Sequence, residues 1–197
     1  MVRLLRIEIR SDSVILDGYV NAVERDSRPV VTERGKCVER IEARAFEKAL
    51  NRTNNVDFLL NHNKNRKLGS TGEGNIELFE DNIGLRAIAT VTDEEVIKKA
   101  KQRKLKGWSF GMFVNEDAIE ERADGLPIRR VKDLDLVEVS IIDDRLNPVY
   151  TATSVETRAD EEVVNEQRGS EFRAIIVDNT STDYSKYEEK IKKLKGE

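Results

Sequence analysis

A serine stands between two glycines inside an apolar run that alternates like a β-strand. The run is Gly107-Trp108-Ser109-Phe110-Gly111-Met112-Phe113-Val114. Successive side chains of a strand point to opposite faces, so the apolar residues at even positions share one face and Ser109 lies on the other. The glycines at 107 and 111 remove bulk from the serine's own row, which lets a backbone or a bound peptide approach the hydroxyl. The pattern predicts a strand that presents a candidate nucleophile.

The same residues match G-x-S-x-G, the nucleophile elbow of α/β-hydrolases. An elbow needs a strand, a sharp turn and a helix, and its triad runs in the order serine, acid, histidine. The single histidine of this chain, His62, precedes Ser109, and the residues after Ser109 continue a β pattern. The sequence therefore argues against the elbow.

His62 follows a short β-like run, Val56 to Leu60, and has two interpretations. It is an ordinary surface histidine in a loop, or it is the general base for Ser109. Imidazole suits the second role because its unperturbed pKa of about 6.5 allows proton transfer near neutrality.

Composition excludes several classes of protein. The 197 residues suffice for one domain and a tail, and a net charge of −4 gives little reason to expect a nucleic-acid partner. Cys37 is the only cysteine, which excludes an internal disulfide and fits a reducing compartment. One histidine and one cysteine cannot supply a typical zinc site, so no metal or cofactor is expected. No run is apolar enough for a signal peptide or a membrane span, and we expect a soluble cytoplasmic protein.

Periodicity predicts mainly β structure with two helices before the tail. The first half is expected to contain a hairpin over 3–20, a loop over 21–36, an amphipathic helix over 41–51, a strand over 56–60 and a polar loop that closes at 68–69. The second half is expected to contain a hairpin over 76–91, a helix from a Thr92/Glu95 capping box to about 105, a strand from 107 into a charged arm near 121, a turn at 123–127 and a long strand over 128–142. The basic residues that end the second helix follow the order that the helix dipole favours, which explains them without a nucleic acid.

Glu138 repeats the arrangement of Ser109 on the long strand. By parity it shares a face with Leu134, Leu136 and Ser140, opposite the row of Val137, Val139 and Ile141. Glu138 is either an ordinary outward residue or a partly covered carboxylate. A covered carboxylate needs a partner, and an imidazolium is a natural one.

Residues 152–197 differ in character from 1–151. Acidic and polar residues dominate, with one β-like patch at Phe172 to Val177 and a possible helix at Tyr184 to Lys195. We expect a domain over 1–151 and a flexible or partner-dependent tail over 152–197.

Four motifs in this order resemble the tailed-phage prohead proteases, a family similar to the herpesvirus assemblins. They are Asn61-His62, Leu68-Gly69, Gly107-Trp108-Ser109-Phe110-Gly111 and Asp135-Leu136-Val137-Glu138-Val139-Ser140. The resemblance covers about residues 3–150 and implies an α+β fold, a small β-barrel of about seven strands with flanking helices. Residues 40–46 depart from the family's usual Pro-Gly-Ala-Phe entry into the first helix.

The resemblance implies a serine endopeptidase with Ser109 as nucleophile and His62 as general base. Assemblins use a second histidine as the third member, which this chain lacks, so a carboxylate must take its place. Glu138 is the first choice, Asp135 the second and Asp133 the third. Arg145 and Arg130 are candidates for the oxyanion hole.

The family role implies cleavage of the scaffolding part of the major capsid protein, and of the enzyme itself, inside the immature capsid in the host cytoplasm. A homodimer is possible, because assemblins pair through a helix. Two other classes stay open: a non-catalytic β-barrel that acts as a scaffold or assembly factor, and a serine esterase of unrelated fold.

Overall fold

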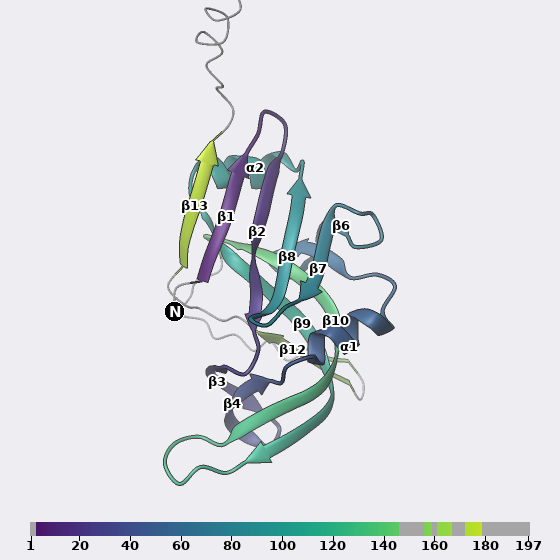
Figure 1. The fold of residues 1–197 in the computed structure, drawn as a ribbon, viewed down its shortest axis with the longest axis vertical. Helices are drawn as coiled ribbons and strands as arrows, with labels where there is room; N and C mark the ends of the chain where they lie inside the picture. The colour runs from purple at the N-terminus through teal and green to yellow at the C-terminus, as the bar shows by residue number, and fades with distance from the viewer. Residues whose placement is uncertain (1–2, 146–155, 159–160, 167–171, 179–197) are drawn as a thin grey trace, which may run out of the picture.

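The computed structural model describes residues 3–145, 156–158, 161–166 and 172–178, which form two β-sheets and two helices (Figure 1). The first sheet has the strand order β13-β1-β2-β8-β7. The second has the order β11-β12-β9-β10-β4-β3, and β5 joins β10 and carries β6 on its other side. A mainly β fold with helices is therefore confirmed. Both sheets are open, so the expected closed barrel is not confirmed.

The strands and helices have the following bounds: β1 Arg3–Ile9, β2 Val14–Ala22, β3 Asp26–Thr32, β4 Gly35–Ile41, α1 Ala45–Arg52, β5 Asp57–Leu60, β6 Asn63–Ser70, β7 Ile76–Glu80, β8 Gly84–Val91, α2 Glu94–Lys101, β9 Leu105–Glu120, β10 Ile128–Asp143, β11 Glu156–Arg158, β12 Glu161–Glu166 and β13 Phe172–Asp178. Among these elements, no helix is long and apolar enough to cross a membrane.

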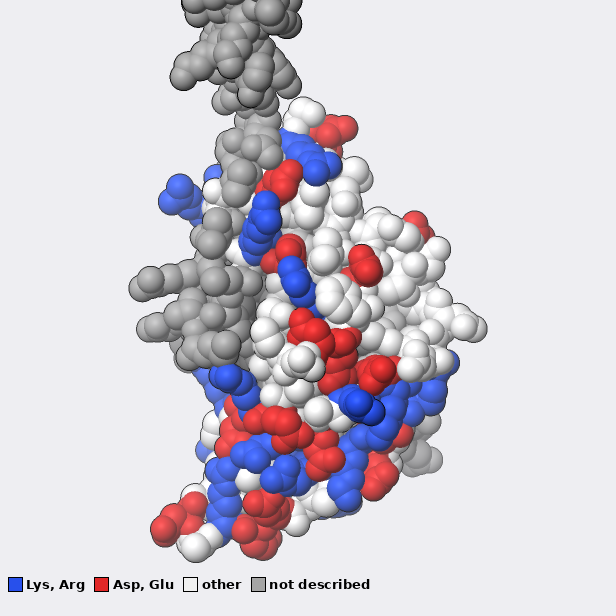
Figure 2. All heavy atoms as spheres, in the orientation of Figure 1, with Lys and Arg blue, Asp and Glu red and all other residues white. Residues whose placement is uncertain are grey.

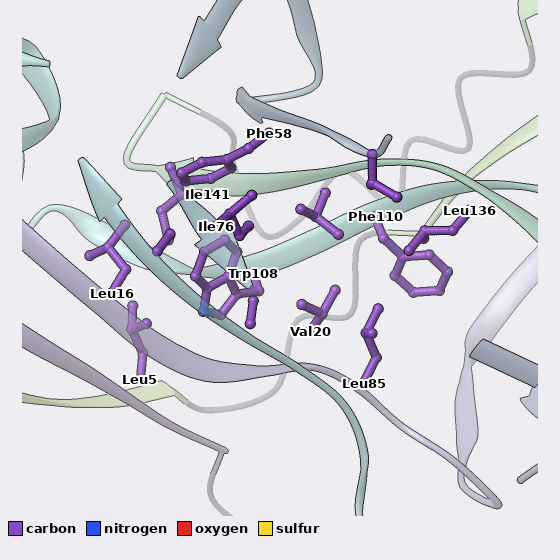
Figure 3. Packing of buried hydrophobic residues seen from close by; sticks show 14 of the residues in the cluster. Leu5, Leu16, Val20, Phe58, Ile76, Leu85, Trp108, Phe110, Leu136 and Ile141 are labelled. Atoms are coloured by element: carbon purple, nitrogen blue, oxygen red, sulfur yellow. The ribbon is translucent and has the colours of Figure 1, made fainter. Parts of the chain in front are cut away.

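The core lies between the two sheets. Leu5 and Leu16 of the first sheet face Trp108 and Ile141 of the second, and all four side chains are buried (Figure 3). Full burial of one large apolar side chain stabilises a fold by about 1.5–3 kcal/mol. Since the even-numbered residues of β9 fill this core, Ser109 lies on the opposite face of its strand, as predicted.

The two longest strands, β9 and β10, pair along their length and carry the second sheet. Their antiparallel register places Ser140 opposite Ser109. β5 runs parallel to the C-terminal half of β10, with Leu59 beside Ser140. The candidate nucleophile therefore lies where three strands from distant parts of the sequence meet.

A β-bulge in β10 changes the face on which its side chains lie. Met112 pairs with Leu136 and Gly111 with Glu138, so Val137 is the extra residue. Leu136 and Val139 consequently both face the core. The predicted placement of Glu138 on the face of Leu134 and Leu136 was therefore wrong, because strict alternation does not hold across a bulge: both leucines lie in the core with Val139 and Ile141.

Beyond this region β9 and β10 continue into an arm, which consists of β3, β4, Asp117–Glu120 of β9 and Ile128–Val131 of β10. The sequence predicted a loop over 21–36, and the structure instead has β3 and β4 there. Their residues are polar and include Pro29, so they lack the apolar alternation of a sheet with one buried face. The charged residues interleave on this part of the surface (Figure 2), with ion pairs such as Arg40–Asp26 and Arg130–Glu120.

Both helices begin later than predicted. Ile41 belongs to β4, and α1 starts at Ala45, with Arg44 in the left-handed region at φ 70°. The N-cap of α2 is Asp93, whose side chain accepts a hydrogen bond from the Val96 N–H, and not Thr92. Asp93 directly precedes the first helical residue, Glu94, and aspartate is a preferred residue at this N-cap position.

Three short strands lie in the part of the chain that was expected to be a tail. The β-like patch at 172–177 is confirmed as β13, which pairs with β1 in parallel. β12 pairs with β9, and β11 pairs with β12. The boundary at 151/152 stays a prediction, and the possible helix at 184–195 lies outside the described residues.

Candidate active site

A tight turn at Asn61-His62 orients the imidazole over the second sheet. β5 and β6 form a hairpin in which Leu60 pairs with Asn63, and both turn residues have positive φ, 56° and 57°. Such values at both central positions are typical of a type I′ turn, which asparagine tolerates well. The polar loop predicted after His62 is thus the strand β6, whose residues 63–67 lack apolar alternation.

Three hydrogen bonds fasten this turn to β10. The backbone N–H of Asn61 donates to the carbonyl of Ile141 (3.0 Å), and the N–H of His62 donates to Ser140 Oγ (3.1 Å). The Asn61 side chain accepts from the N–H of Asp143 (2.9 Å). These contacts fix the imidazole relative to β10 and, through the pairing of β10 with β9, relative to Ser109.

A glycine after the turn holds β6 in place. Gly69 has φ 153°, and a Cβ built there would lie 1.9 Å from Asn75 Oδ1. Asn75 donates to the carbonyl of Leu68 (2.8 Å) and accepts from the N–H of Ser70 (3.0 Å). The Leu68-Gly69 pair of the sequence motif therefore gives Asn75 access to the backbone of β6.

The structure brings Ser109, His62 and Glu138 into one hydrogen-bonded chain. His62 Nε2 lies 2.9 Å from Ser109 Oγ, and His62 Nδ1 lies 2.6 Å from Glu138 Oε1. A carboxylate accepts hydrogen bonds, so it favours the tautomer in which Nδ1 carries the proton. In that tautomer the lone pair of Nε2 is directed to the serine hydroxyl.

Ser140 completes the environment of Glu138. Its hydroxyl donates to Glu138 Oε2 (2.6 Å) while accepting from the His62 N–H. Sequence analysis gave Ser140 no role, although its place two residues after Glu138 on the same face is a signal that it lies beside the carboxylate. Gly111 stands opposite Glu138 on β9, so no side chain of that strand competes for the space.

Three members of the group are buried and the imidazole is partly exposed. Ser109 is 2% exposed, Glu138 6% and Ser140 0%, while the His62 side chain is 12% exposed. Water is largely excluded from these groups, so hydrogen bonds between them are stronger than they are at a surface.

The other candidate residues lie elsewhere. Asp133 and Asp135 both bind Arg52, at the C-terminal end of α1, and Glu138 is the carboxylate that contacts His62. Arg130 pairs with Glu120 in the arm, ten residues before Ser140, which is about 30 Å along a strand. Arg130 is therefore not brought to Ser109, because the extended strand carries it away.

Arg145 lies just beyond β10 and binds two carboxylates. Its guanidinium contacts Asp143 (2.8 Å) and Glu95 of α2 (3.1 Å). Asp143 is fully buried, and Lys99 of α2 also contacts it (3.0 Å). Burial alone would raise the pKa of the Asp143 carboxyl, but hydrogen bonds from Arg145, Asn61 and Lys99 outweigh it and hold that pKa well below its usual range.

A serine hydroxyl, an imidazole and a carboxylate in this order are the parts that hydrolases with a serine nucleophile employ. Comparison with protein families agrees with that class. Residues 4–168 match the family described as Caudovirus prohead serine protease, and the chain belongs to this family of phage capsid-maturation proteases. No curated protein and no solved structure matches the chain.

Proposed function

We propose that this protein is a serine endopeptidase of prohead maturation in which Ser109 is the nucleophile, His62 the general base and Glu138 the acid of the triad. The observation that carries the proposal is the continuous hydrogen-bonded chain from Ser109 Oγ through His62 to Glu138. The nucleophile and base are already within hydrogen-bond reach, which is the geometry that proton transfer needs.

The first half of the reaction acylates the enzyme. His62 Nε2 removes the proton of Ser109 as the hydroxyl oxygen attacks the carbonyl carbon of a peptide bond. The imidazolium is stabilised by Glu138, which faces its Nδ1–H. The tetrahedral intermediate then expels the amine, which takes its proton from His62 Nε2, and an ester to Ser109 remains.

The second half releases the acyl group. Water enters where the amine left, and His62 removes its proton as the oxygen attacks the ester carbonyl. The serine oxygen leaves and recovers the proton from Nε2, which restores the starting state. Arg145 remains our candidate for a charged oxyanion donor, and its guanidinium would have to exchange a carboxylate partner to serve.

The substrate that we propose is the scaffolding part of a phage major capsid protein, together with the enzyme's own C-terminal region. Family membership supports a capsid-protein substrate. We place the reaction inside the immature capsid in the host cytoplasm, with a homodimer as a possible assembly and without a nucleic-acid partner.

The test is co-expression of the protease with a phage major capsid protein that carries its scaffolding part, followed by intact-mass measurement of both chains. Ser109→Ala should abolish cleavage with the fold retained, since loss of a nucleophile costs on the order of 10⁶ in turnover. Undiminished cleavage by the folded variant would overturn the assignment, and labelling of the wild type at Ser109 by a fluorophosphonate would support it.

The carboxylate is tested with a matched pair of variants. Glu138→Gln should lower turnover by about 10⁴-fold, by analogy with other triad acids. Asp135→Asn, which removes a charge that contacts Arg52, should leave turnover near the wild-type value. The reverse result would show that Glu138 is not the acid.

A further inference from the structure

β9, the strand that carries Ser109, pairs with β10 on one side. On its other side it pairs with β12, a segment from the C-terminal part of the same chain. β12 pairs with β9 in the antiparallel sense, with Val164 opposite Met112, Asn165 opposite Gly111 and Glu166 opposite Phe110. Phe110 is the residue that follows Ser109. β12 thus approaches the nucleophile along the side of β9 that does not face β10 (Figure 1).

An endopeptidase substrate needs the same edge. A peptide bond is presented to a nucleophile most simply by an extended segment, and an extended segment binds a sheet by adding a strand to an edge. Phe110 and Met112 point into the core, so this part of β9 offers its backbone to a partner. Backbone pairing accepts a polypeptide of almost any sequence, so an extended segment of a capsid protein fits this site.

The burial of Ser109 also suits a substrate site that is closed in this structure. The residue is 2% exposed although its row on β9 also contains Gly107 and Gly111, which have no side chains to cover it. A residue with so little exposed surface leaves little room for a substrate beside it, which agrees with a site that opens further when a neighbouring segment leaves.

We propose that β12 is an internal competitor that occupies the substrate-strand site on β9 and must leave before an external polypeptide binds. The inference rests on the proposed function, since it assigns the substrate site of that same activity. β12 is linked covalently to β10, so its effective concentration at β9 is on the order of millimolar. An external substrate can then bind only to the fraction of molecules in which β12 has left β9.

The experiment weakens the pairing of β12 in the full-length chain. Adjacent N–H groups of a strand point to opposite sides, so one of the residues Val164 and Asn165 directs its N–H toward β9 and the other away from it. β11 pairs only with residues 161–163 of β12 and does not reach either. Proline removes the N–H, so Val164→Pro and Asn165→Pro act as each other's control. The double variant Val164→Thr/Asn165→Ser keeps both N–H groups.

The measurement is the rate at which Ser109 reacts with a peptidyl phosphonate, a probe that needs the strand site. We expect one of the two proline variants to react about tenfold faster than the wild type, as for a strand docked nine-tenths of the time. We expect the other proline variant and the Thr/Ser variant to react at the wild-type rate. Hydrogen exchange should show loss of protection at 110–112 in the faster variant, with protection of β2 and β8 unchanged.

Equal rates in all four proteins, together with hydrogen exchange at 110–112 that does not change, would overturn the inference. A small fluorophosphonate separates this result from failure of the proposed function. If that probe labels Ser109 in none of the proteins, the nucleophile assignment fails; if it labels all of them while the peptidyl probe shows no difference, only the role of β12 fails. If one proline variant loses protection from hydrogen exchange in the whole chain, it has unfolded, and the other single variant still provides the comparison with the wild type.

Discussion

Ser140 has two contacts that no other residue of the site can replace. It donates to Glu138 and accepts from the backbone of His62, so one hydroxyl fixes both the carboxylate and the turn that holds the imidazole. The side chain is fully buried, and its loss would leave the His62 N–H and one Glu138 oxygen without this partner. In the proposed triad Ser140 is therefore a positioning residue.

Ser140→Ala should lower kcat by about 10- to 100-fold with KM nearly unchanged, because a small misplacement of the base affects the chemical step more than binding. The proton between His62 Nδ1 and Glu138 should also lose its far-downfield NMR signal. A variant that merely loses stability would keep both kcat and that signal below its unfolding temperature, and such a result would limit Ser140 to a structural role.

At the level of elements, the N-terminus of α1 is capped by a carboxylate from the strand β7. Its N-cap, Arg44, makes no side-chain cap bond, and Glu80 at the end of β7 accepts from the backbone N–H groups of Arg44 (2.6 Å) and Glu47 (2.8 Å). A negative charge at a helix N-terminus also interacts favourably with the helix dipole. Phe46 of α1 packs edge-to-face on Phe110, so this cap supports the strand that carries Ser109.

Glu80→Ala should lower the free energy of unfolding by about 1–2 kcal/mol, the usual cost of removing a helix cap. Urea unfolding at neutral pH measures it. Glu77 is exposed on the same strand, and Glu77→Ala is the matched control, with an expected change below about 0.5 kcal/mol. Equal effects of the two substitutions would show that the contacts with α1 contribute nothing.

The elements that the sequence predicted are those with a clear apolar period. β9, β10 and β8 show alternation and were found, whereas β3 and β6 are polar strands whose stability comes from their neighbours. The bulge at Val137 also escaped prediction, because one inserted residue leaves no mark in composition.

The candidate site was predictable to a similar extent. Ser109, His62 and Glu138 were singled out by residue type and position, and their roles were implied by the resemblance to the prohead proteases; the structure brings the three side chains together. The roles of Ser140 and of β12 depend on strand register and pairing, which local sequence does not contain.

For the whole molecule, the buried Asp143 joins the second sheet to α2. It lies at the end of β10, contacts Lys99 of α2 and Arg145, and its backbone N–H donates to Asn61, which is next to His62. Lys99 also contacts Asp144, and Arg145 also contacts Glu95. The cluster therefore couples the packing of the helix on the sheet to the turn that positions His62.

This cluster should make the fold sensitive to acid. The folded-state pKa of Asp143 lies below its value in the unfolded chain, about 3.9, so the ionised carboxylate contributes its full stability above about pH 5. As the pH falls below that, the unfolded chain binds a proton that the folded protein does not, and the contribution is lost progressively toward the folded-state pKa. The turn at Asn61-His62 should loosen over the same range.

Asp143→Asn should accordingly lower the free energy of unfolding by about 2 kcal/mol at pH 7, the worth of a buried hydrogen bond between charged groups. The difference from the wild type should shrink steadily between about pH 5 and pH 2, because the wild type loses there what the variant already lacks. Urea unfolding at several pH values measures both. Asp144→Asn is the matched control, since Asp144 contacts the same lysine but is exposed, and its effect should be smaller at every pH. A difference between Asp143→Asn and the wild type that stays constant from pH 7 to pH 2 would show that the ionisation of Asp143 does not stabilise the fold.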